Sequence, residues 1–485
     1  MRIGLDIDNV ITDLDKTILE EFIKLDKLKK NKGIINPYAR HITKGMFDIT
    51  DEEVHEFYAN NMEKLAKYLE PRKGAKYYMD KLLEDGHELY LISHRVYPDY
   101  KNPKETTIQW LKDNSINYTK LILSKTTDKS PECIKYNIDI MFDDVVSNCL
   151  KLRDKGIAVC LMETRYNKIY RKDLPMVKVW SELYDKIKDM SEKKKVILDT
   201  DMYNEVDDYF ALTYLMSSLD RFDVEAITIA PFLKSGYANT STIEEGIEKS
   251  YDVTLKILDM INLSKYKLKV YKGATSYTSD SMESNDAVSK IIDIALNNDK
   301  TTIIAIGAIT NVALAIKKEP KIIDKIEVVW LGGNSPILKQ NQEFNFRQDI
   351  NAVKIVFESK VKLTIIPCRG VASNLVTTTY ELEHYLNKST IGRYLCENFK
   401  NLKKHYYKTE LEEYGSSKVL WDISAVAYLI NKDWFVTEKV SCPNVLSNGC
   451  YEMTTNNHEV TFVIDLFRNK IFNDYFIKMQ KYNNK

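Results

Sequence analysis

Three features are missing from this sequence of 485 residues: a cysteine pattern, an excess of one charge and a long apolar run. The seven cysteines form no C-x-x-C pair, which excludes the common thiolate metal sites, and an odd, unpatterned set is typical of a reducing compartment. Lys and Arg together number 70, as do Asp and Glu, so no net field draws the chain to nucleic acid or to an anionic membrane.

The most apolar long window, residues 301–316, is shorter than the roughly 20 residues that a membrane-spanning helix needs. Met1 leads directly into an apolar segment, which predicts that there is no signal peptide. We therefore expect a cytoplasmic protein that binds neither membrane nor nucleic acid.

The chain is too long for one hydrophobic core, and its length predicts two to four domains. Short apolar runs alternate with amphipathic stretches, which predicts an α/β protein with two parallel sheets covered by helices. A charged segment at 181–195 separates two such series, so we expect domains at 1–190 and 194–485. Residues 14–73 show helical periodicity without a strand pattern, which predicts a helical cap after the first strand. The expected strands are 3–7, 88–92, 121–123, 138–142 and 158–161, then 196–198, 224–229, 268–271, 302–306, 326–331 and 363–366, with antiparallel strands near an edge within 435–464.

Both domains open with the same chemical pattern, an apolar run that ends in two aspartates one residue apart. The pairs are Asp6 with Asp8 and Asp199 with Asp201. Side chains alternate across a strand, so each pair is expected to project to one side at the end of a buried strand. Two carboxylates that close repel each other unless a cation or a shared proton compensates them. The sequence therefore predicts two separate metal-dependent active sites.

The first domain carries a set of residues suited to phosphoryl transfer. Asp6 is placed to attack phosphorus, and Asp8 to protonate the leaving alkoxide. Asp6 and Asp143 are expected to hold magnesium, while Ser93 binds a phosphate oxygen. A lysine neutralises the developing charge. The segments that supply these groups are Ser93-His94-Arg95, Lys125 with Lys129, and Asp143-Asp144.

At these residues the first domain resembles the haloacid dehalogenase superfamily of phosphatases. Asp6, Asp8 and Thr12 match its D-x-D-x-x-x-T signature, and the other motifs follow in order over about residues 1–190. The helical insertion makes the domain most similar to the small 5′-nucleotidases, where Lys129 fits the motif better than Lys125. The resemblance implies a magnesium site at Asp6, Asp8 and Asp143.

The second domain has the denser acidic cluster, with four carboxylates within ten residues: Asp199, Asp201, Asp207 and Asp208. Such a density requires a divalent cation, and an oxygen-only ligand set suits calcium. Three later segments also contain candidate polar residues: 305–311, 330–345 and 420–424. None of these has the pattern of a phosphate loop or a nucleophilic triad.

These residues resemble the calcium-dependent nucleoside hydrolases of the inosine-uridine-preferring family, across residues 194–485. The resemblance implies that Asp201 is the base that deprotonates the water held by calcium. The calcium ligands that it implies are Asp201, Asp208, Asp422 and the main-chain carbonyl of Ile306. The candidates for binding substrate are Asp207, Asn204, Asn334, Glu343, Asn345 and Trp421, of which Asp207, Glu343 and Asn345 are expected to hold the ribose.

The expected chemistry explains the acidic character of this site. Cleavage of an N-glycosidic bond passes through an oxocarbenium-like state, which nearby carboxylates stabilise while a base activates water. Calcium orients the water and the 2′- and 3′-hydroxyls of the ribose. A free cis-diol is therefore expected to be essential.

The second domain departs from the family pattern at two places. The interval from Asp201 to Asp207 is two residues longer, which introduces Asn204 and Glu205. Trp421 stands where many purine-active members carry a histidine, so the proton for the leaving base must come from elsewhere. The candidates are His405, Tyr406 and Tyr407, with a surface or packing role as the alternative for each.

Together the two domains indicate a bifunctional hydrolase of nucleotide salvage or catabolism, which first removes a 5′-phosphate and then cleaves the nucleoside. One alternative is that the first domain is a non-catalytic nucleotide sensor that regulates the second. Another is a substrate with a modified base, such as a deazapurine nucleoside of the queuosine type, because Trp421 breaks the common purine pattern. The expected partners are small-molecule nucleosides and nucleotides, and the resemblance implies a homodimer or homotetramer.

Overall fold

The computed structural model describes two compact units, Met1–Glu192 and Lys193–Lys485. The described residues are 1–172, 174–233, 238, 240–406 and 417–483, and for 172 and 403–406 only the backbone is described. None of the helices in these ranges is both long and apolar enough to cross a membrane.

The first unit is built on a six-stranded, fully parallel sheet with the order β3-β2-β1-β4-β5-β6. Its central strand β1 therefore has neighbours from far along the chain on both sides, and parallel sheets generally bind ligands beyond the carboxyl end of such a strand. The strands are β1 (Arg2–Leu5), β2 (Glu88–Ser93), β3 (Lys120–Leu123), β4 (Ile140–Asp143), β5 (Ala158–Met162) and β6 (Met176–Val177).

Helices cover both faces of this sheet because its strands bury alternate side chains on opposite sides. Leu89 and Leu91 of β2 pack into one core cluster, whereas Tyr90 and Ile92 pack into another. The covering helices are α3 (Ala75–Glu84), α4 (Pro103–Asp113), α5 (Ser130–Lys135), α6 (Val146–Asp154) and α7 (Trp180–Ser191), with a 3-10 turn η1 (Lys168–Lys172).

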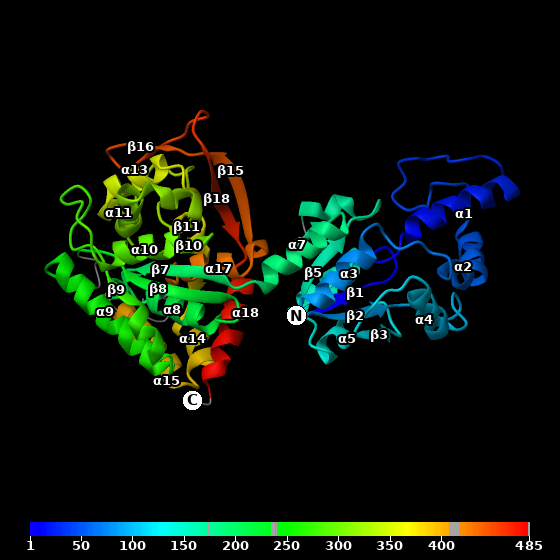
Figure 1. Ribbon diagram of the computed structural model, residues 1–485, viewed down its shortest axis with the longest axis horizontal. Coiled ribbons are helices and arrows are strands. Elements are labelled where there is room, and N and C mark those ends of the chain that lie inside the picture. Colours follow the sequence, from blue (N-terminus) through cyan, green and yellow to red (C-terminus); the bar gives the residue numbers. More distant parts are fainter. Residues whose placement is uncertain (173, 234–237, 239, 407–416, 484–485) are drawn as a thin grey trace. The chain divides into compact units, whose positions relative to one another are not determined.

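A helical cap is inserted between β1 and α3. It consists of α1 (Leu14–Lys29) and α2 (Asp51–Ala66), joined by a long connection (Figure 1). The cap has a hydrophobic core of its own, in which the rings of Phe22 and Phe57 meet edge to face at 4.9 Å. A capping box between Thr50 and Glu53 fixes the start of α2.

The second unit is built on an eight-stranded sheet with the order β15-β18-β12-β11-β10-β7-β8-β9. All strands run parallel except β15, which pairs antiparallel with β18 at the edge. The strands are β7 (Lys194–Thr200), β8 (Phe222–Ile229), β9 (Val270–Lys272), β10 (Thr301–Ala305), β11 (Ile326–Leu331), β12 (Lys362–Ile366), β15 (Phe435–Ser441) and β18 (Glu459–Leu466). Two small two-stranded sheets lie outside the eight-stranded sheet. They are β13 (Val376–Thr377) with β14 (Lys418–Val419), and β16 (Asn444–Val445) with β17 (Tyr451–Glu452).

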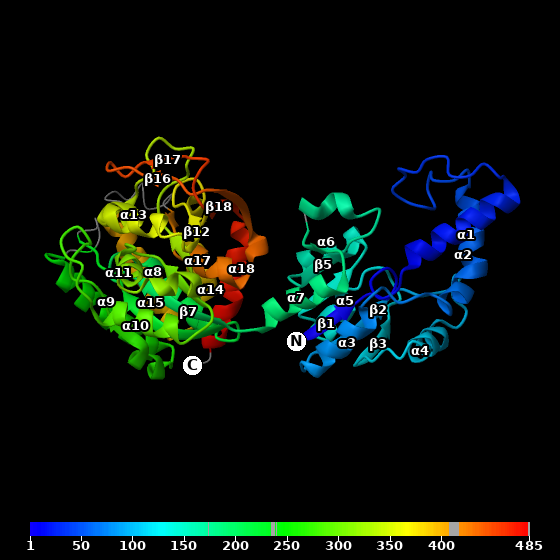
Figure 2. The ribbon, with the colours of Figure 1, turned by 45° about the horizontal axis from the view of Figure 1, so that its top comes forward.

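The second sheet is also covered by helices on both faces, as Figure 2 shows. Val196 and Leu198 of β7 pack into one core cluster and Ile197 into the other. On one face lie α8 (Asp207–Ser217), α9 (Ile243–Met260), α14 (Thr379–Leu386), α15 (Thr390–Tyr406), α17 (Ile423–Ile430) and α18 (Arg468–Met479). On the other lie α10 (Asp286–Leu296), α11 (Thr310–Lys318) and α13 (Ile350–Glu358), preceded by the short α12 (Phe344–Gln348). Short 3-10 turns are η2 (Ser264–Lys269), η3 (Pro320–Lys325), η4 (Ala372–Asn374), η5 (Lys432–Trp434) and η6 (Gln480–Tyr482).

The expected α/β class with two parallel-sheet units is confirmed, but several strand boundaries differ, and the short strand β6 is absent from the sequence prediction. The first strand ends at Leu5, because the carbonyl of Ile7 accepts hydrogen bonds from the N–H groups of Ile11 and Thr12 and closes a turn there. The strand expected at 268–271 begins only at Val270, because η2 occupies the residues before it. The short edge strand β6 has too few residues for a visible alternation.

Candidate active sites

Three buried carboxylates converge at the carboxyl end of the first sheet: Asp6, Asp143 and Asp144. Asp6 follows β1, and its N–H donates to the carbonyl of Phe142 on the neighbouring strand at 2.9 Å. Asp143 ends β4, and Asp144 begins the loop after it. One oxygen from each carboxylate lies within 4.8 Å of the others, which is a spacing that one cation can span.

Lys129 lies between two of these carboxylates. Its Nζ is 2.9 Å from Asp6 Oδ2 and 2.7 Å from Asp143 Oδ2, and its side chain is 2% exposed. Burial opposes the charge of the ammonium group, but Asp6 and Asp143 together raise the pKa of Lys129. The structure thus brings Lys129 into the site, whereas Lys125 is exposed.

One positive charge does not balance three buried carboxylates. Burial, with Asp143 and Asp8 as negative neighbours, raises the pKa of Asp6 to about 6 despite the opposing effect of Lys129. Burial and the charges of Asp143 and Asp6 raise the pKa of Asp144 well above its usual value. This surplus of negative charge in an oxygen-only site fits a small divalent cation such as magnesium.

Asp144 is the member of this cluster that sequence reasoning left without a role, although it follows Asp143 directly. Its Oδ2 accepts hydrogen bonds from Asn9 Nδ2 at 3.0 Å and from the hydroxyl of Tyr166. The His41 ring of the cap connection stacks on Tyr166 at 5.3 Å. The doubled aspartate is a signal that could have revealed Asp144, whereas Tyr166 lies 22 residues further on and has no local signal.

The structure separates Asp8 from the three-carboxylate cluster. Since β1 ends at Leu5, the Asp6 and Asp8 side chains follow a turn rather than the alternation of a strand, and they meet different partners. Asp8 forms a bidentate ion pair with Arg95, with Arg95 Nε 3.0 Å from Oδ2 and a terminal nitrogen 2.6 Å from Oδ1. Asp8 nonetheless lies near enough to raise the pKa of Asp6, and its expected part in holding magnesium stays a prediction.

Ser93 ends β2 beside β1 and is buried, so it lies at the same edge of the sheet as the acidic cluster. Its carbonyl accepts a hydrogen bond from the N–H of Ser124 at 2.9 Å, which fixes the loop that leads to Lys129. Contact of its hydroxyl with a phosphate stays a prediction.

A second group of three buried carboxylates forms in the other unit: Asp207, Asp208 and Asp422. Asp207 and Asp208 open α8, and Asp422 directly precedes α17, so helix N-termini contribute favourable dipoles to all three. Oxygens of the three lie within 4.8 Å of one another although 214 residues separate Asp208 from Asp422 in the sequence.

The carboxylates of Asp208 and Asp422 lie close together, and each affects the pKa of the other. Burial raises the pKa of Asp208 to about 7, although hydrogen bonds from Thr200 and Asp422 oppose the shift. Burial and the charges of Asp207, Asp208 and Asp201 raise the pKa of Asp422 well above its usual value. A shared proton or a cation must offset this repulsion, so the donor set fits calcium.

Asp201 follows β7 and faces this group. Burial and the charge of Asp208 raise the pKa of Asp201 well above its usual value, while a hydrogen bond with the Asn204 side chain opposes the shift. Its Oδ2 is buried and accepts no hydrogen bond from the described residues. Gly307 gives it room, because a Cβ there would lie 3.0 Å from Asp201 Oδ1. A buried oxygen with no protein donor is suited to accept a proton from water or to bind a cation.

The Ile306 carbonyl lies at the end of β10, where its orientation is held from two sides. The N–H of Ile306 donates to the carbonyl of Asp199 at 2.8 Å. Asn345 Nδ2 donates to the Ile306 carbonyl at 2.9 Å and to that of Leu331 at 3.1 Å. A carbonyl has two lone pairs, so the one on Ile306 keeps capacity for a further partner.

Glu343 and Asn334 hold a loop in the described structure. The Glu343 carboxylate accepts hydrogen bonds from the backbone N–H groups of Gly333, Asn345 and Phe346, each at 2.8 Å. Asn334 Nδ2 donates to the carbonyls of Gln340 and Gln342 at 3.2 Å, and its Oδ1 accepts from the N–H of Arg369 at 3.0 Å. Their role in holding a ribose stays a prediction.

Trp421 is half-buried beside the acidic group, and its backbone N–H donates to Asp207 Oδ2 at 3.2 Å. Its indole packs against the helical core cluster of that face, which is a structural role that needs no base. The His405 and Tyr406 side chains and all of Tyr407 lie outside the described residues.

Asp199 is placed apart from the other acids of its segment. Its Oδ1 accepts hydrogen bonds from Thr228 Oγ1 at 2.7 Å and from Asn311 Nδ2 at 2.8 Å. Burial nonetheless raises the pKa of Asp199 to about 6. Asn311 thus fixes the end of β7 just before Asp201. It belongs to the segment 305–311, which the sequence predicts to be part of the site.

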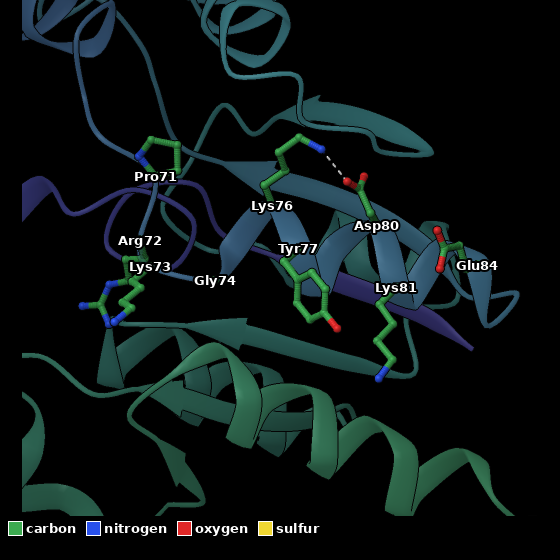
Figure 3. A pocket seen from close by; sticks show the side chains of 9 residues that line it. All are labelled: Pro71, Arg72, Lys73, Gly74, Lys76, Tyr77, Asp80, Lys81 and Glu84. Atoms are coloured by element: carbon green, nitrogen blue, oxygen red, sulfur yellow. Dashed lines mark hydrogen bonds and ion pairs between the residues drawn. The ribbon is translucent and has the colours of Figure 1, made fainter.

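A surface hollow of about 770 Å³ lies along α3 in the first unit (Figure 3). None of the described residues that line it is a candidate site residue. Lys76 pairs with Asp80 at 2.5 Å, and Lys81 lies 4.4 Å from the Tyr184 ring, so these cations have protein partners. The hollow therefore carries no functional assignment.

Comparison with known families matches each unit separately. The model of the inosine-uridine preferring nucleoside hydrolases matches residues 196–473, more than half of the chain. The model described as "5′ nucleotidase, deoxy (Pyrimidine), cytosolic type C protein" matches residues 1–194. The suspected fusion of a haloacid dehalogenase-like nucleotidase with a nucleoside hydrolase is thus confirmed at the level of the families.

Individual relatives resemble only part of the chain. The pyrimidine-specific ribonucleoside hydrolases RihB of Escherichia coli and Shigella sonnei are each 30% identical over 178 residues, which are 36% of this chain and 56% of each relative. The chain thus spans about half the length of these relatives. A purine-preferring ribonucleoside hydrolase from Gardnerella vaginalis, 22% identical, superposes with a TM-score of 0.50 over 60% of this chain and 99% of its own, which shows a shared fold.

Proposed function

Since the chain belongs to the inosine-uridine preferring nucleoside hydrolase family over residues 196–473, we propose that its second unit hydrolyses the N-glycosidic bond of a ribonucleoside to free base and ribose. The convergence of Asp207, Asp208 and Asp422 beside the unpartnered buried oxygen of Asp201 carries this proposal. Acidic groups in that arrangement suit a reaction that develops positive charge on the sugar.

The residues of the second site have distinct proposed roles in binding the cation, activating water and binding the ribose. Asp208, Asp422, Asp201 and the Ile306 carbonyl hold calcium, which supplies Lewis-acid activation of water and a clamp for the ribose diol when it is bound. Asp201 accepts the proton of the attacking water, for which its buried, unpartnered oxygen is suited. Asp207 accepts a hydrogen bond from a ribose hydroxyl, while Asn345 orients the Ile306 carbonyl.

We propose that the first unit is a phosphomonoesterase for nucleoside 5′-monophosphates. Asp6, Asp143 and Asp144 hold magnesium, which supplies charge neutralisation for the phosphate when it is bound. Asp6 attacks phosphorus, Lys129 neutralises charge on the phosphoryl oxygens, and Asp8 exchanges a proton with the leaving oxygen. The match of residues 1–194 to a 5′ nucleotidase family supports this assignment.

The two proposed reactions join in one order, because the product of the first is the substrate of the second. Dephosphorylation of a ribonucleoside monophosphate gives a ribonucleoside, which the second unit cleaves. The pyrimidine specificity in the names of the matched hydrolases, and the word pyrimidine in the nucleotidase family description, support a pyrimidine base. Uridine and cytidine monophosphates are therefore the first substrates to test.

Loss of the 2′-hydroxyl is expected to slow the second reaction by about 100-fold, because a buried polar site that binds a hydroxyl rejects the analogue lacking it. Comparison of uridine with 2′-deoxyuridine by release of uracil measures this effect. The 5′-deoxy analogue is the matched control, since it keeps the cis-diol. Equal rates for uridine and 2′-deoxyuridine would argue against a diol clamp.

Chelation of calcium is expected to destabilise the second unit more at pH 8 than at pH 6. Burial raises the pKa of Asp208 to about 7 and that of Asp199 to about 6, from an ordinary 3.8. Between about pH 4 and pH 7 the cation-free folded unit therefore binds more protons than the unfolded chain, so its free energy of unfolding falls as the pH rises. Calcium binds the ionised carboxylates and removes this penalty.

Thermal unfolding with excess calcium or with chelator, at each pH, measures the effect. We expect chelation to lower Tm by about 5 °C at pH 8 and by clearly less at pH 6. The Asp422→Asn variant serves as control, because it removes one of the repelling charges and should shrink the shift at pH 8. A Tm that is insensitive to chelator at both values of pH would contradict calcium binding.

A further inference from the structure

Arg95 is an unusual residue to find beside a group that transfers protons. Its side chain is completely buried, and two of its nitrogens bind Asp8, at 3.0 Å to Oδ2 and 2.6 Å to Oδ1. A third guanidinium nitrogen donates to Thr107 Oγ1 at 3.0 Å, and the Tyr100 ring lies 5.5 Å from the guanidinium carbon. Bidentate pairs of this kind fix the orientation of the carboxylate as well as its charge.

The contacts of Arg95 lead from Asp8 to the cap. Thr107, on α4, donates its hydroxyl hydrogen to the carbonyl of Pro103 at 2.6 Å, which orients the oxygen that Arg95 binds. The N-terminus of α4 is held in turn by Glu63 of the cap helix α2. The Glu63 carboxylate accepts hydrogen bonds from the N–H of Asn102 at 2.7 Å, the N–H of Lys101 at 3.1 Å and Thr106 Oγ1 at 3.1 Å.

We propose that Arg95 is a positioning residue for Asp8, and that Glu63 anchors it to the cap through α4. The proposal rests on the proposed phosphomonoesterase activity of the first unit. In that reaction the bond from phosphorus to the leaving oxygen breaks as the bond to Asp6 forms, and the leaving oxygen takes a proton from Asp8. Asp8 then takes a proton from the water that releases phosphate from Asp6. Each Asp8 oxygen accepts one N–H and keeps a further acceptor site for these transfers.

Two classes of ester separate positioning of Asp8 from general support of the fold. The alkoxide of a nucleoside leaves only with a proton, whereas 4-nitrophenolate leaves without one. A misplaced Asp8 therefore slows hydrolysis of a nucleoside monophosphate and spares 4-nitrophenyl phosphate. A variant that only loosens the fold slows both substrates alike.

The test measures kcat and KM for both esters, with magnesium, in the full-length chain. We expect Arg95→Lys, which keeps the charge but loses the bidentate geometry, to lower kcat for the monophosphate by about 100-fold and kcat for the aryl ester by less than about threefold, with similar KM values. Thr107→Val and Glu63→Ala are expected to lower kcat in the same selective manner, by about fivefold. Arg171→Lys, which alters a surface ion pair with Glu163, is the matched control and should change neither rate.

A selective loss of monophosphate hydrolysis in Arg95→Lys would support the positioning role of Arg95. Equal losses for the two esters, or no loss for either, in Arg95→Lys would overturn it. If Arg95→Lys does not fold, Thr107→Val and Glu63→Ala decide in the same way, because neither removes the buried ion pair. A wild-type protein that hydrolyses neither ester would instead overturn the proposed function of the first unit.

Discussion

Replacing Asp201 with alanine is expected to lower ribonucleoside hydrolysis by about 1,000-fold, which is the contribution that a positioned general base typically makes. Asp201 is buried, its pKa is raised by burial and by Asp208, and its Oδ2 accepts no hydrogen bond from the described residues. A buried carboxylate beside other acids costs stability when no cation compensates it, so the variant should fold at least as well as the wild type in the absence of calcium. Release of base from uridine measures the loss, and Tm measures the fold.

Asp223→Ala is the matched control for this variant. Asp223 is an exposed aspartate on β8 of the same unit, so its removal should leave base release unchanged. An Asp201→Ala protein that releases base at more than about a tenth of the wild-type rate would exclude Asp201 as the general base, since tenfold is well below the usual contribution.

The Asp6→Asn variant is expected to lose phosphate release by about 10,000-fold, because an amide cannot form the phosphoryl-enzyme that a carboxylate nucleophile forms. Asparagine has nearly the same shape and can still contact Lys129, which keeps its 2.7 Å ion pair with Asp143. The change also removes one of three repelling carboxylates, so no loss of stability is expected. Release of inorganic phosphate from uridine monophosphate under magnesium measures the effect.

Ribonucleoside hydrolysis by Asp6→Asn is the internal control, because the variant leaves the second unit intact. Base release from uridine should therefore equal that of the wild type. Retention of phosphate release would show that Asp6 is not the nucleophile. Altered base release from uridine would instead favour a first unit that regulates the second.

The fold class and the family of each unit follow from local patterns in the sequence. Apolar runs that alternate with amphipathic ones predict parallel sheets, and the absence of strand periodicity in residues 14–73 predicts the cap. Acids that lie next to one another in sequence, such as Asp207 and Asp208, are also close in space. Local spacing is sufficient in these cases because a strand end or a helix start fixes where the side chains lie.

The contacts that orient the acids are not predictable in the same way. Arg95 is 87 residues from Asp8 in the sequence, and Asn345 is 39 residues from the Ile306 carbonyl that it holds. Neither residue type is rare enough to identify its partner, and only the folded sheet brings them together. The turn at Ile7 is a short-range case that the sequence does not predict. Because β1 ends before it, Asp6 contacts Lys129 whereas Asp8 contacts Arg95.

A single product assay tests most directly whether the two units act in sequence on one substrate. Uridine and cytidine monophosphates, their 2′-deoxy forms and the free nucleosides are incubated with wild type, Asp6→Asn and Asp201→Ala under magnesium and calcium, and the products are separated by chromatography. The tandem reaction predicts free base from the ribonucleotides in wild type, nucleoside in Asp201→Ala and unchanged nucleotide in Asp6→Asn. Base that forms only from nucleosides, with no effect of Asp6→Asn on any product, would contradict it.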